Sequence, residues 1–200
     1  MFAKNGRLAL NLTFKNALAV MFLVFIVSAP SITHAQAQKD QFIIDSGISF
    51  TQATVTQAQN GLVGLDLQAY KMLTNNISLG FEAGYDVVSF KKLDNYYSRL
   101  GVMPFIIKSK YFVNPGGRFQ IHATVGGGLY ITNPHLDIVP VGDISSAKTL
   151  YGGSVGVGFN YWYLLIQGIG GEFEYHFFPT QDGSTFSYFA LRLNFSLIKF

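Results

Sequence analysis

The stretch GGSVGVGFNYWY, residues 152–163, decides between two very different proteins. Its first five residues match G-x-S-x-G, the pattern of a hydrolase nucleophile elbow with Ser154 as the nucleophile. From Val155 to Tyr161, however, every second residue is apolar or aromatic, and the residues between them are glycine or asparagine. An elbow needs a strand, a strained turn and a helix, and no helical pattern follows Ser154. The stretch therefore predicts a β-strand.

The same period of two recurs along the chain after Lys39. It is clear in FIIDSGISF (42–50), GLVGLDLQAY (61–70), ISLGFEAGYDV (77–87), FQIHATVGGGLYI (119–131), GIGGEFEYHFF (168–178) and FSYFALRLNFSL (186–197), and less regular in LGVMPFIIKSKYFV (100–113). Such alternation indicates strands whose two faces meet different media. We expect about eight strands in an all-β fold.

The predicted connections alternate between short and long. Tight turns are expected at 74–76, at 114–118 and near Trp162, and longer polar loops at 52–60, 91–98, 132–148 and 178–184. The two prolines of the third loop argue against strand pairing there. Short turns at one rim and long loops at the other are typical of an antiparallel up-and-down barrel, with both chain ends on the short-turn side.

The N-terminus has the pattern of a cleavable signal peptide, residues 1–37. Three basic residues precede the apolar run 17–27, which is shorter than the roughly 20 residues of a spanning helix. Small residues allow cleavage after Ala35 or Ala37, so the barrel would occupy 38–200. Removing the three basic residues from the 14 Lys and Arg leaves 11 against 11 Asp and Glu. The neutral remainder argues against a nucleic-acid partner, and the absence of cysteine excludes disulfides and thiolate zinc sites.

Alternation alone does not say which face is inside. A soluble lipocalin-like calyx has an apolar interior, whereas a small membrane barrel has an apolar skin and a polar lumen. Only 12% of the residues are charged, about half the usual share, which favours the membrane barrel. The charges on the polar face suit a lumen of ion pairs: Asp45, Asp66, Glu82, Lys108, Lys110, Glu172, Glu174 and Arg192.

Within this cluster we expect Arg192 at the centre, with Glu172 opposite it and Asp45 approaching from the first strand. Glu82 and Lys108 should meet across another hairpin. Aromatic residues near the strand ends, Tyr161, Trp162 and Tyr163, are expected to lie in the membrane interface. A lumen of this size holds only side chains, so no wide channel is expected.

These features together resemble the OmpA-like small outer-membrane β-barrel family. The resemblance rests on the signal peptide, the alternating strands, VGGGLYI (125–131), GGSVGVGFNY (152–161) and the terminal Phe200. It implies insertion into a bacterial outer membrane, contact with its lipid and lipopolysaccharide, and an assembly signal that ends at Phe200 and is read by the barrel-assembly machinery. The apolar positions 191–197 are one step out of phase with Phe200, which predicts a bulge or frayed end. We expect no peptidoglycan-binding domain after the barrel.

Two enzymatic alternatives compete with a non-enzymatic structural or surface-interaction role. Ser154 with Glu172 or Glu174 and His176 has the chain order of a catalytic triad. His122 and Thr124 resemble the His-x-Ser pair of outer-membrane lipid A deacylases, although the threonine and the expected inward orientation depart from that pattern. The histidines lack metal-ligand spacing, and the glycine runs lack the context of a nucleotide site. We therefore expect no catalytic residue, metal or cofactor, and an unknown surface ligand held by the loops.

Overall fold

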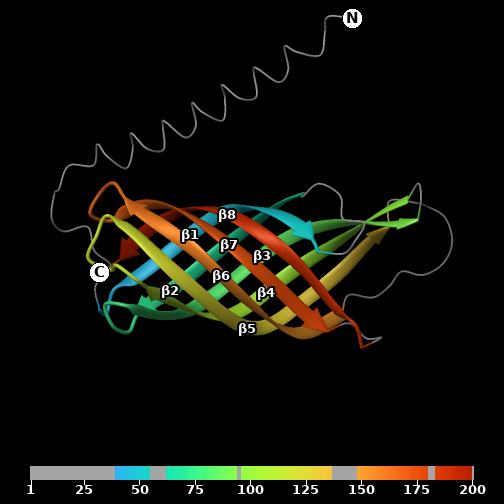
Figure 1. Cartoon of the computed structure of the whole chain (residues 1–200), viewed down its shortest axis with the longest axis horizontal. Coiled ribbons are helices and arrows are strands. Elements are labelled where there is room, and N and C mark those ends of the chain that lie inside the picture. The colour runs from blue at the N-terminus through green and yellow to red at the C-terminus, as the bar shows by residue number, and fades with distance from the viewer. Residues whose placement is uncertain (1–38, 55–61, 94–95, 137–147, 180–182, 200) are drawn as a thin grey trace, which may run out of the picture. The chain divides into compact units, whose positions relative to one another are not determined.

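Eight antiparallel strands close into one barrel in the computed structural model, each paired with its neighbours in chain order (Figure 1). The structure describes residues 39–54, 62–93, 96–136, 148–179 and 183–199. The predicted signal peptide lies outside these ranges, and within them no helix is long and apolar enough to cross a membrane. The prediction of an all-β, eight-stranded up-and-down barrel is confirmed.

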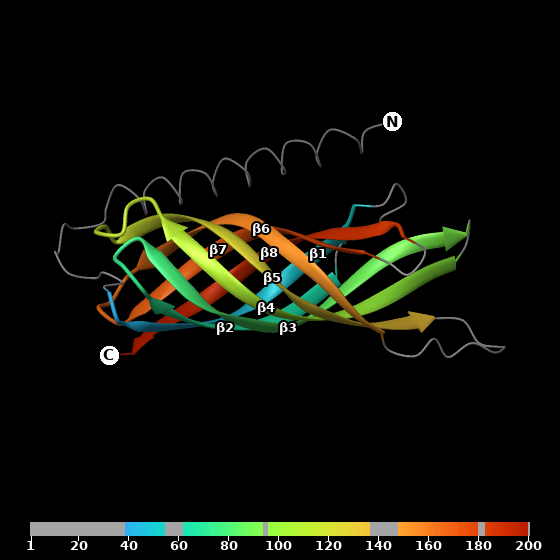
Figure 2. The same cartoon turned by 90° about the horizontal axis from the view of Figure 1, so that it is seen from below.

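The strands are tilted relative to the long axis of the barrel, as Figures 1 and 2 show from two sides. They are β1 (Phe42–Ala53), β2 (Leu62–Met72), β3 (Ile77–Leu93), β4 (Tyr96–Phe112), β5 (Phe119–Leu136), β6 (Lys148–Trp162), β7 (Gln167–Pro179) and β8 (Thr185–Lys199). Pairing of β1 with β8, from Phe42 opposite Lys199 to Ala53 opposite Tyr188, closes the barrel. The first and last strands thus begin and end at the rim that carries the short turns, as predicted.

Alternation along each strand separates a polar interior from an apolar exterior. In β1, the side chains of Asp45 and Ser49 are fully buried, whereas Ile44, Ile48 and Phe50 are 39–43% exposed. The same division holds in the other strands, where Val, Leu, Ile and Phe side chains cover the outside. A soluble calyx needs the opposite arrangement, so that alternative is wrong. A closed barrel with an apolar skin is one of the two structures that satisfy all backbone hydrogen bonds in lipid.

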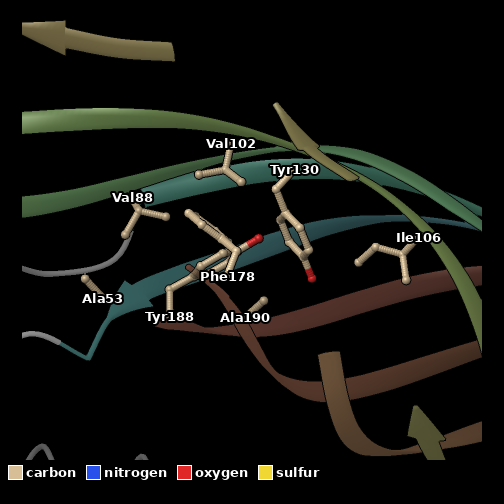
Figure 3. Packing of buried hydrophobic residues seen from close by; sticks show 8 residues of the cluster. All are labelled: Ala53, Val88, Val102, Ile106, Tyr130, Phe178, Tyr188 and Ala190. Carbon is tan, nitrogen blue, oxygen red and sulfur yellow. The ribbon is translucent and has the colours of Figure 1, made fainter. Parts of the chain in front are cut away.

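Apolar side chains gather at both ends of the otherwise polar interior, which the alternation did not predict. At the short-turn rim, six apolar or aromatic side chains pack together as the short-turn plug: Ile43, Tyr70, Met72, Phe112, Trp162 and Ile198. At the other rim, the long-loop plug consists of Ala53, Val88, Val102, Ile106, Tyr130, Phe178, Tyr188 and Ala190 (Figure 3). Both plugs contain fully buried side chains. The lumen is therefore closed at both ends by apolar packing.

The hairpins at the long-loop rim are longer than predicted. Residues 91–98 were expected to form a loop, but β3 continues to Leu93 and β4 begins at Tyr96, with a register shift between Lys91 and Leu93. Likewise β5 continues through Pro134, which lies opposite Leu100 on β4. A proline lacks only its own N–H, so it can remain in a strand where that donor is not needed for pairing.

The last strand is regular, which corrects a second expectation. Its register with β1 runs without interruption from Tyr188 to Lys199, so the predicted bulge or frayed end is absent from the described part of β8. Ile198 turns inward and joins the short-turn plug, in phase with the inward Ser196 and Asn194. The apolar phase of the strand is thus continuous. Phe200 lies outside the described residues.

Candidate functional site

Arg192 on β8 lies at the centre of the lumen, as predicted, and is fully buried. Its Nη2 donates to Glu82 Oε1 at 2.7 Å and its Nη1 to Glu82 Oε2 at 3.2 Å, a two-point grip on one carboxylate of β3. Nη1 also contacts Glu174 of β7. Asp66 Oδ1 lies 3.8 Å from Nε, and Asp86 Oδ2 lies 3.8 Å from Nη2. Arginine suits this position because its planar guanidinium has five donors and stays charged when buried.

Two lysines of β4 supply the other positive charges among the described buried residues. Lys108 Nζ contacts Glu82, as predicted, and lies 2.6 Å from Glu174 Oε1. Lys110 Nζ lies 3.2 Å from Asp45 Oδ2 and 3.4 Å from Glu172 Oε2. Lys108 and Lys110 are two positions apart in β4, so both ammonium groups lie on the inner face. From there they reach across the lumen to β7 and β1.

All eight predicted lumen charges are buried inside the barrel, but Glu172 and Asp45 form their ion pairs with lysines instead of Arg192. Glu172 lies opposite Arg192 in the register of β7 and β8, yet its carboxylate forms its ion pairs with the two lysines. Asp45 pairs with Lys110 instead of approaching Arg192. Backbone register places residues on neighbouring strands, whereas long side chains in a narrow lumen also reach across it.

Several lumen residues beyond the predicted cluster form its hydrogen-bond network. Asp86 accepts hydrogen bonds from Ser49 Oγ at 2.6 Å and from Tyr188 Oη at 2.8 Å. His176 contacts Tyr130 Oη through Nδ1 at 3.0 Å and Arg192 Nη2 through Nε2 at 3.3 Å. Asp86 and His176 both fall on the polar phase of their strands, so the alternation that identified the other charges could have found them.

The geometry does not assemble the triad that Ser154 suggests. Ser154 lies in the middle of β6, faces the lumen and is directly opposite His176 on β7. Its Oγ nevertheless has no hydrogen-bond partner in the described structure, while both imidazole nitrogens are occupied by Tyr130 and Arg192. A nucleophile requires a base within hydrogen-bond reach. The opening stretch is a strand of the wall, and G-x-S-x-G is a coincidence of glycine spacing.

The deacylase-like pair also faces the lumen. His122 is 2% and Thr124 5% exposed. Thr124 donates to Glu174 Oε1 at 3.3 Å, and the His122 ring lies 5.3 Å from that of Phe112. The resemblance to the deacylases implies a pair on the lipid-facing side of the barrel, whereas these two residues lie on the inner face of β5.

The exterior carries the apolar band of a membrane protein, but one predicted interfacial residue is wrong. Tyr163 is 38% exposed at the short-turn rim, as expected for an aromatic of the interface, and Tyr161 is partly exposed. Trp162 points inward instead: its side chain is fully buried in the short-turn plug, and Nε1 donates to Gln120 Oε1 at 2.9 Å. The strict alternation of β6 runs through Trp162, so three successive aromatics cannot share one face.

Comparison of the whole barrel with solved structures identifies its fold. Neisserial surface protein A matches with a TM-score of 0.53 at 12% identity, covering 78% of this chain and 96% of that one. This chain has the fold of the small outer-membrane β-barrels. Outer membrane protein OprG from Pseudomonas aeruginosa matches with a TM-score of 0.51 at 14% identity, covering 83% and 99% of the two chains. Ail, the attachment invasion locus protein of Yersinia pestis, matches with 0.50 at 11% identity, covering 80% and 100%.

No family model and no curated protein matches the sequence. The small outer-membrane barrel fold therefore rests on the closed eight-stranded topology and its likeness to these structures. The predicted location in a bacterial outer membrane agrees with this fold and with the apolar exterior of the barrel.

Proposed function

We propose that this protein is a non-enzymatic outer-membrane barrel, of the OmpA-like type, whose rigid wall presents surface loops for interaction. The observation that carries the proposal is the sealed lumen. Ion-paired charges fill its middle, and an apolar plug closes each end. Such an interior offers solutes no continuous polar path, and its titratable groups face one another instead of a substrate. The surfaces left for function are the lipid-facing exterior and the long-loop rim.

The partners that fit these surfaces are lipid, lipopolysaccharide and a ligand of the exposed loops. The apolar exterior suits the acyl chains of the membrane. Lys148 lies at the long-loop end of β6, where phosphates of lipopolysaccharide would be within reach. The barrel-assembly machinery would engage β8, the strand that closes the barrel against β1. The central parts of the long loops, 55–61, 137–147 and 180–182, lie outside the described residues.

Surface labelling tests the loop part of this proposal. A short epitope inserted within 137–147 should be labelled by antibody on intact cells, because β5 and β6 lead into this segment at the long-loop rim. The matched control is the same epitope in the turn 114–118 at the opposite rim, which should be labelled only after lysis. The reverse result would overturn the orientation of the barrel and with it the proposed role.

Mass spectra of lipid A separate the non-enzymatic role from the lipid-modifying alternative. Cells with and without the protein should give the same lipid A species, since His122 and Thr124 face the lumen. A deacylated species that depends on the protein and disappears in His122→Ala would contradict the proposal. Heat-modifiable migration of the outer-membrane fraction on gels verifies in the same samples that the barrel is folded.

A further inference from the structure

A group of unsatisfied oxygen atoms gathers on the inner face of three adjacent strands, β8, β1 and β2. Gly47 on β1 lies opposite Asp66 on β2 and Asn194 on β8. At the next inward position, Asp45 lies opposite Gln68 and Ser196. Because side chains at every second position share a face, these positions form two rows of three across the seam where the barrel closes.

Each of the five side chains in these rows is more than nine-tenths buried and holds an oxygen without a hydrogen-bond partner in the described structure. These atoms are Asp45 Oδ1, Asp66 Oδ1, Gln68 Oε1, Asn194 Oδ1 and Ser196 Oγ. A buried polar atom left without a partner destabilises a fold, so native structures rarely leave one unsatisfied, and five together call for ordered water or a bound ligand among them. All are acceptors, and only the serine hydroxyl can also donate.

The first row converges on a single point. Asn194 Oδ1 and Asp66 Oδ1 both lie within 3.0 Å of the place where a Cβ atom of residue 47 would stand. Glycine at this position lets the carboxylate and the amide oxygen approach each other above the backbone of β1. An added methyl group would collide with the Asn194 oxygen. Two acceptors that face the same point repel each other unless a cation or a donor lies between them.

The charges of the lumen also favour a cation. Among the described buried residues, six carboxylates face three basic side chains, with Asp45, Asp66, Glu82, Asp86, Glu172 and Glu174 against Lys108, Lys110 and Arg192. Glu82, Glu174 and His176 lie close enough together to hold a metal, but Arg192 and Lys108 already contact both carboxylates. Asp66 has only the 3.8 Å approach of Arg192 Nε among the ion pairs of the structure. Asp86 has a similar 3.8 Å approach of Arg192 but also accepts hydrogen bonds from Ser49 and Tyr188. The least compensated carboxylate is therefore Asp66 of β2.

We propose that the inner face of β8, β1 and β2 binds one hard cation of the calcium class, held by Asp66 Oδ1 and Asn194 Oδ1. Asp45, Gln68 and Ser196 complete its shell through bound water. Carboxylate, amide and hydroxyl oxygens are the ligands that hard cations select, and the lack of sulfur and imidazole in this group excludes a preference for softer metals. Because the ligands come from both sides of the β1–β8 seam, the cation stabilises the closed barrel.

The two plugs determine how the cation enters. Trp162 and Ile198 close one end and Tyr188 and Phe178 the other. A cation present while the barrel folds is enclosed, whereas one added afterwards must wait for an opening of a plug. Refolding in the presence of the cation and its addition after folding should therefore give different rates of loading.

Refolding into detergent micelles with Ca²⁺ or after exhaustive chelation tests the site. Dialysis followed by elemental analysis should find about one Ca²⁺ per chain, and the loaded protein should unfold at a higher temperature than the chelated protein. Asn194→Ala should weaken Ca²⁺ binding by about tenfold or more, in the range that substitutions around metal sites cost, and should abolish the thermal shift. Mg²⁺ serves as the second probe, with weaker binding expected because it requires stricter geometry.

Asn160→Ala is the matched control, since Asn160 is also a buried lumen amide with an unpartnered atom but lies on β6. It should keep both the bound Ca²⁺ and the thermal shift. If the wild type retains no cation and unfolds at the same temperature with and without Ca²⁺, the proposal is wrong. It is equally overturned if Asn160→Ala and Asn194→Ala lose Ca²⁺ to the same extent, because the metal would then bind elsewhere.

Discussion

Arg192 meets carboxylates from three other strands, Asp66 of β2, Glu82 and Asp86 of β3, and Glu174 of β7. None of these charges has access to bulk water. Surface ion pairs contribute about 0–1 kcal/mol because solvent screens them. Removal of one member of a buried pair costs more, because the other charge remains desolvated and uncompensated.

We therefore predict that Arg192→Leu lowers the free energy of unfolding by about 3–5 kcal/mol. Glu82→Gln combined with Arg192→Leu should cost less than the sum of the two single changes, since Glu82 accepts two hydrogen bonds from the guanidinium. Urea unfolding in micelles measures this double-mutant cycle. Glu172→Gln with Arg192→Leu is the comparison, and should couple more weakly because Glu172 forms its ion pairs with lysines. Equal coupling in both cycles would contradict the described partners.

Trp162 is the single tryptophan of the chain, so its fluorescence reports directly on the short-turn plug. We predict weak quenching of this fluorescence by lipids brominated on their acyl chains, because the indole faces the lumen. The control combines Trp162→Phe with Tyr163→Trp and moves the fluorophore to a side chain that is 38% exposed at the short-turn rim. That variant should be quenched more strongly. Stronger quenching in the wild type than in the control variant would mean that Trp162 lies in the membrane interface.

At the scale of the strand, the paired strands β5 and β6 show how the two faces impose different steric limits on the same residue type. Gly152 faces inward, where an added Cβ would stand 2.7 Å from Phe178 Cβ and 2.8 Å from the Tyr130 ring. Gly127 on β5 faces outward, and its nearest contact would be 3.6 Å away. The Phe177 backbone oxygen of β7 would also collide with a Cβ at residue 152, so both the neighbouring strand and the long-loop plug require glycine at the first position. No contact at the second position requires it.

Gly152→Val should accordingly destabilise the barrel by about 1–3 kcal/mol through overpacking of the plug. Gly127→Val should leave stability within about 0.5 kcal/mol, as usual for surface substitutions. Both values follow from urea unfolding of the two variants against the wild type. Similar losses in both variants would mean that the inward and outward assignment of these strands is wrong.

Sequence alternation predicts the face of almost every strand residue because the side-chain period in a strand is two. Alternation does not predict which inward side chains are apolar or which charges form ion pairs. Some inward positions carry largely apolar side chains, namely Tyr130, Phe178 and Trp162. They lie at the ends of the lumen, where apolar packing excludes water. The partner of Asp45 depends on the stagger of strands around the closed barrel, which no local pattern encodes. Residues 91–93 are assigned to a loop by sequence because Lys91 and Lys92 begin a polar stretch, although the pairing of β3 with β4 continues through this segment.

For the whole molecule, the plugs determine permeability. We predict that the pure protein in planar bilayers gives no stable porin-like conductance, because both ends of the lumen are filled by buried side chains. Single-channel recording is the measurement. A variant with Phe178→Ala and Trp162→Ala thins both plugs and should raise the frequency of brief openings. Sustained steps from the wild type would contradict a sealed barrel.

The charge cluster draws its members from both ends of the chain. Asp45 on β1 pairs with Lys110 on β4, and Arg192 on β8 pairs with Glu82 on β3. A half-inserted sheet, with its first and last strands still apart, would hold these ionised groups against lipid without their counter-charges. The free energy of a partly assembled form is therefore much higher than it would be for a barrel with a neutral interior. Insertion should consequently proceed as an all-or-none event, in which the seam joins and the charges meet at the same moment.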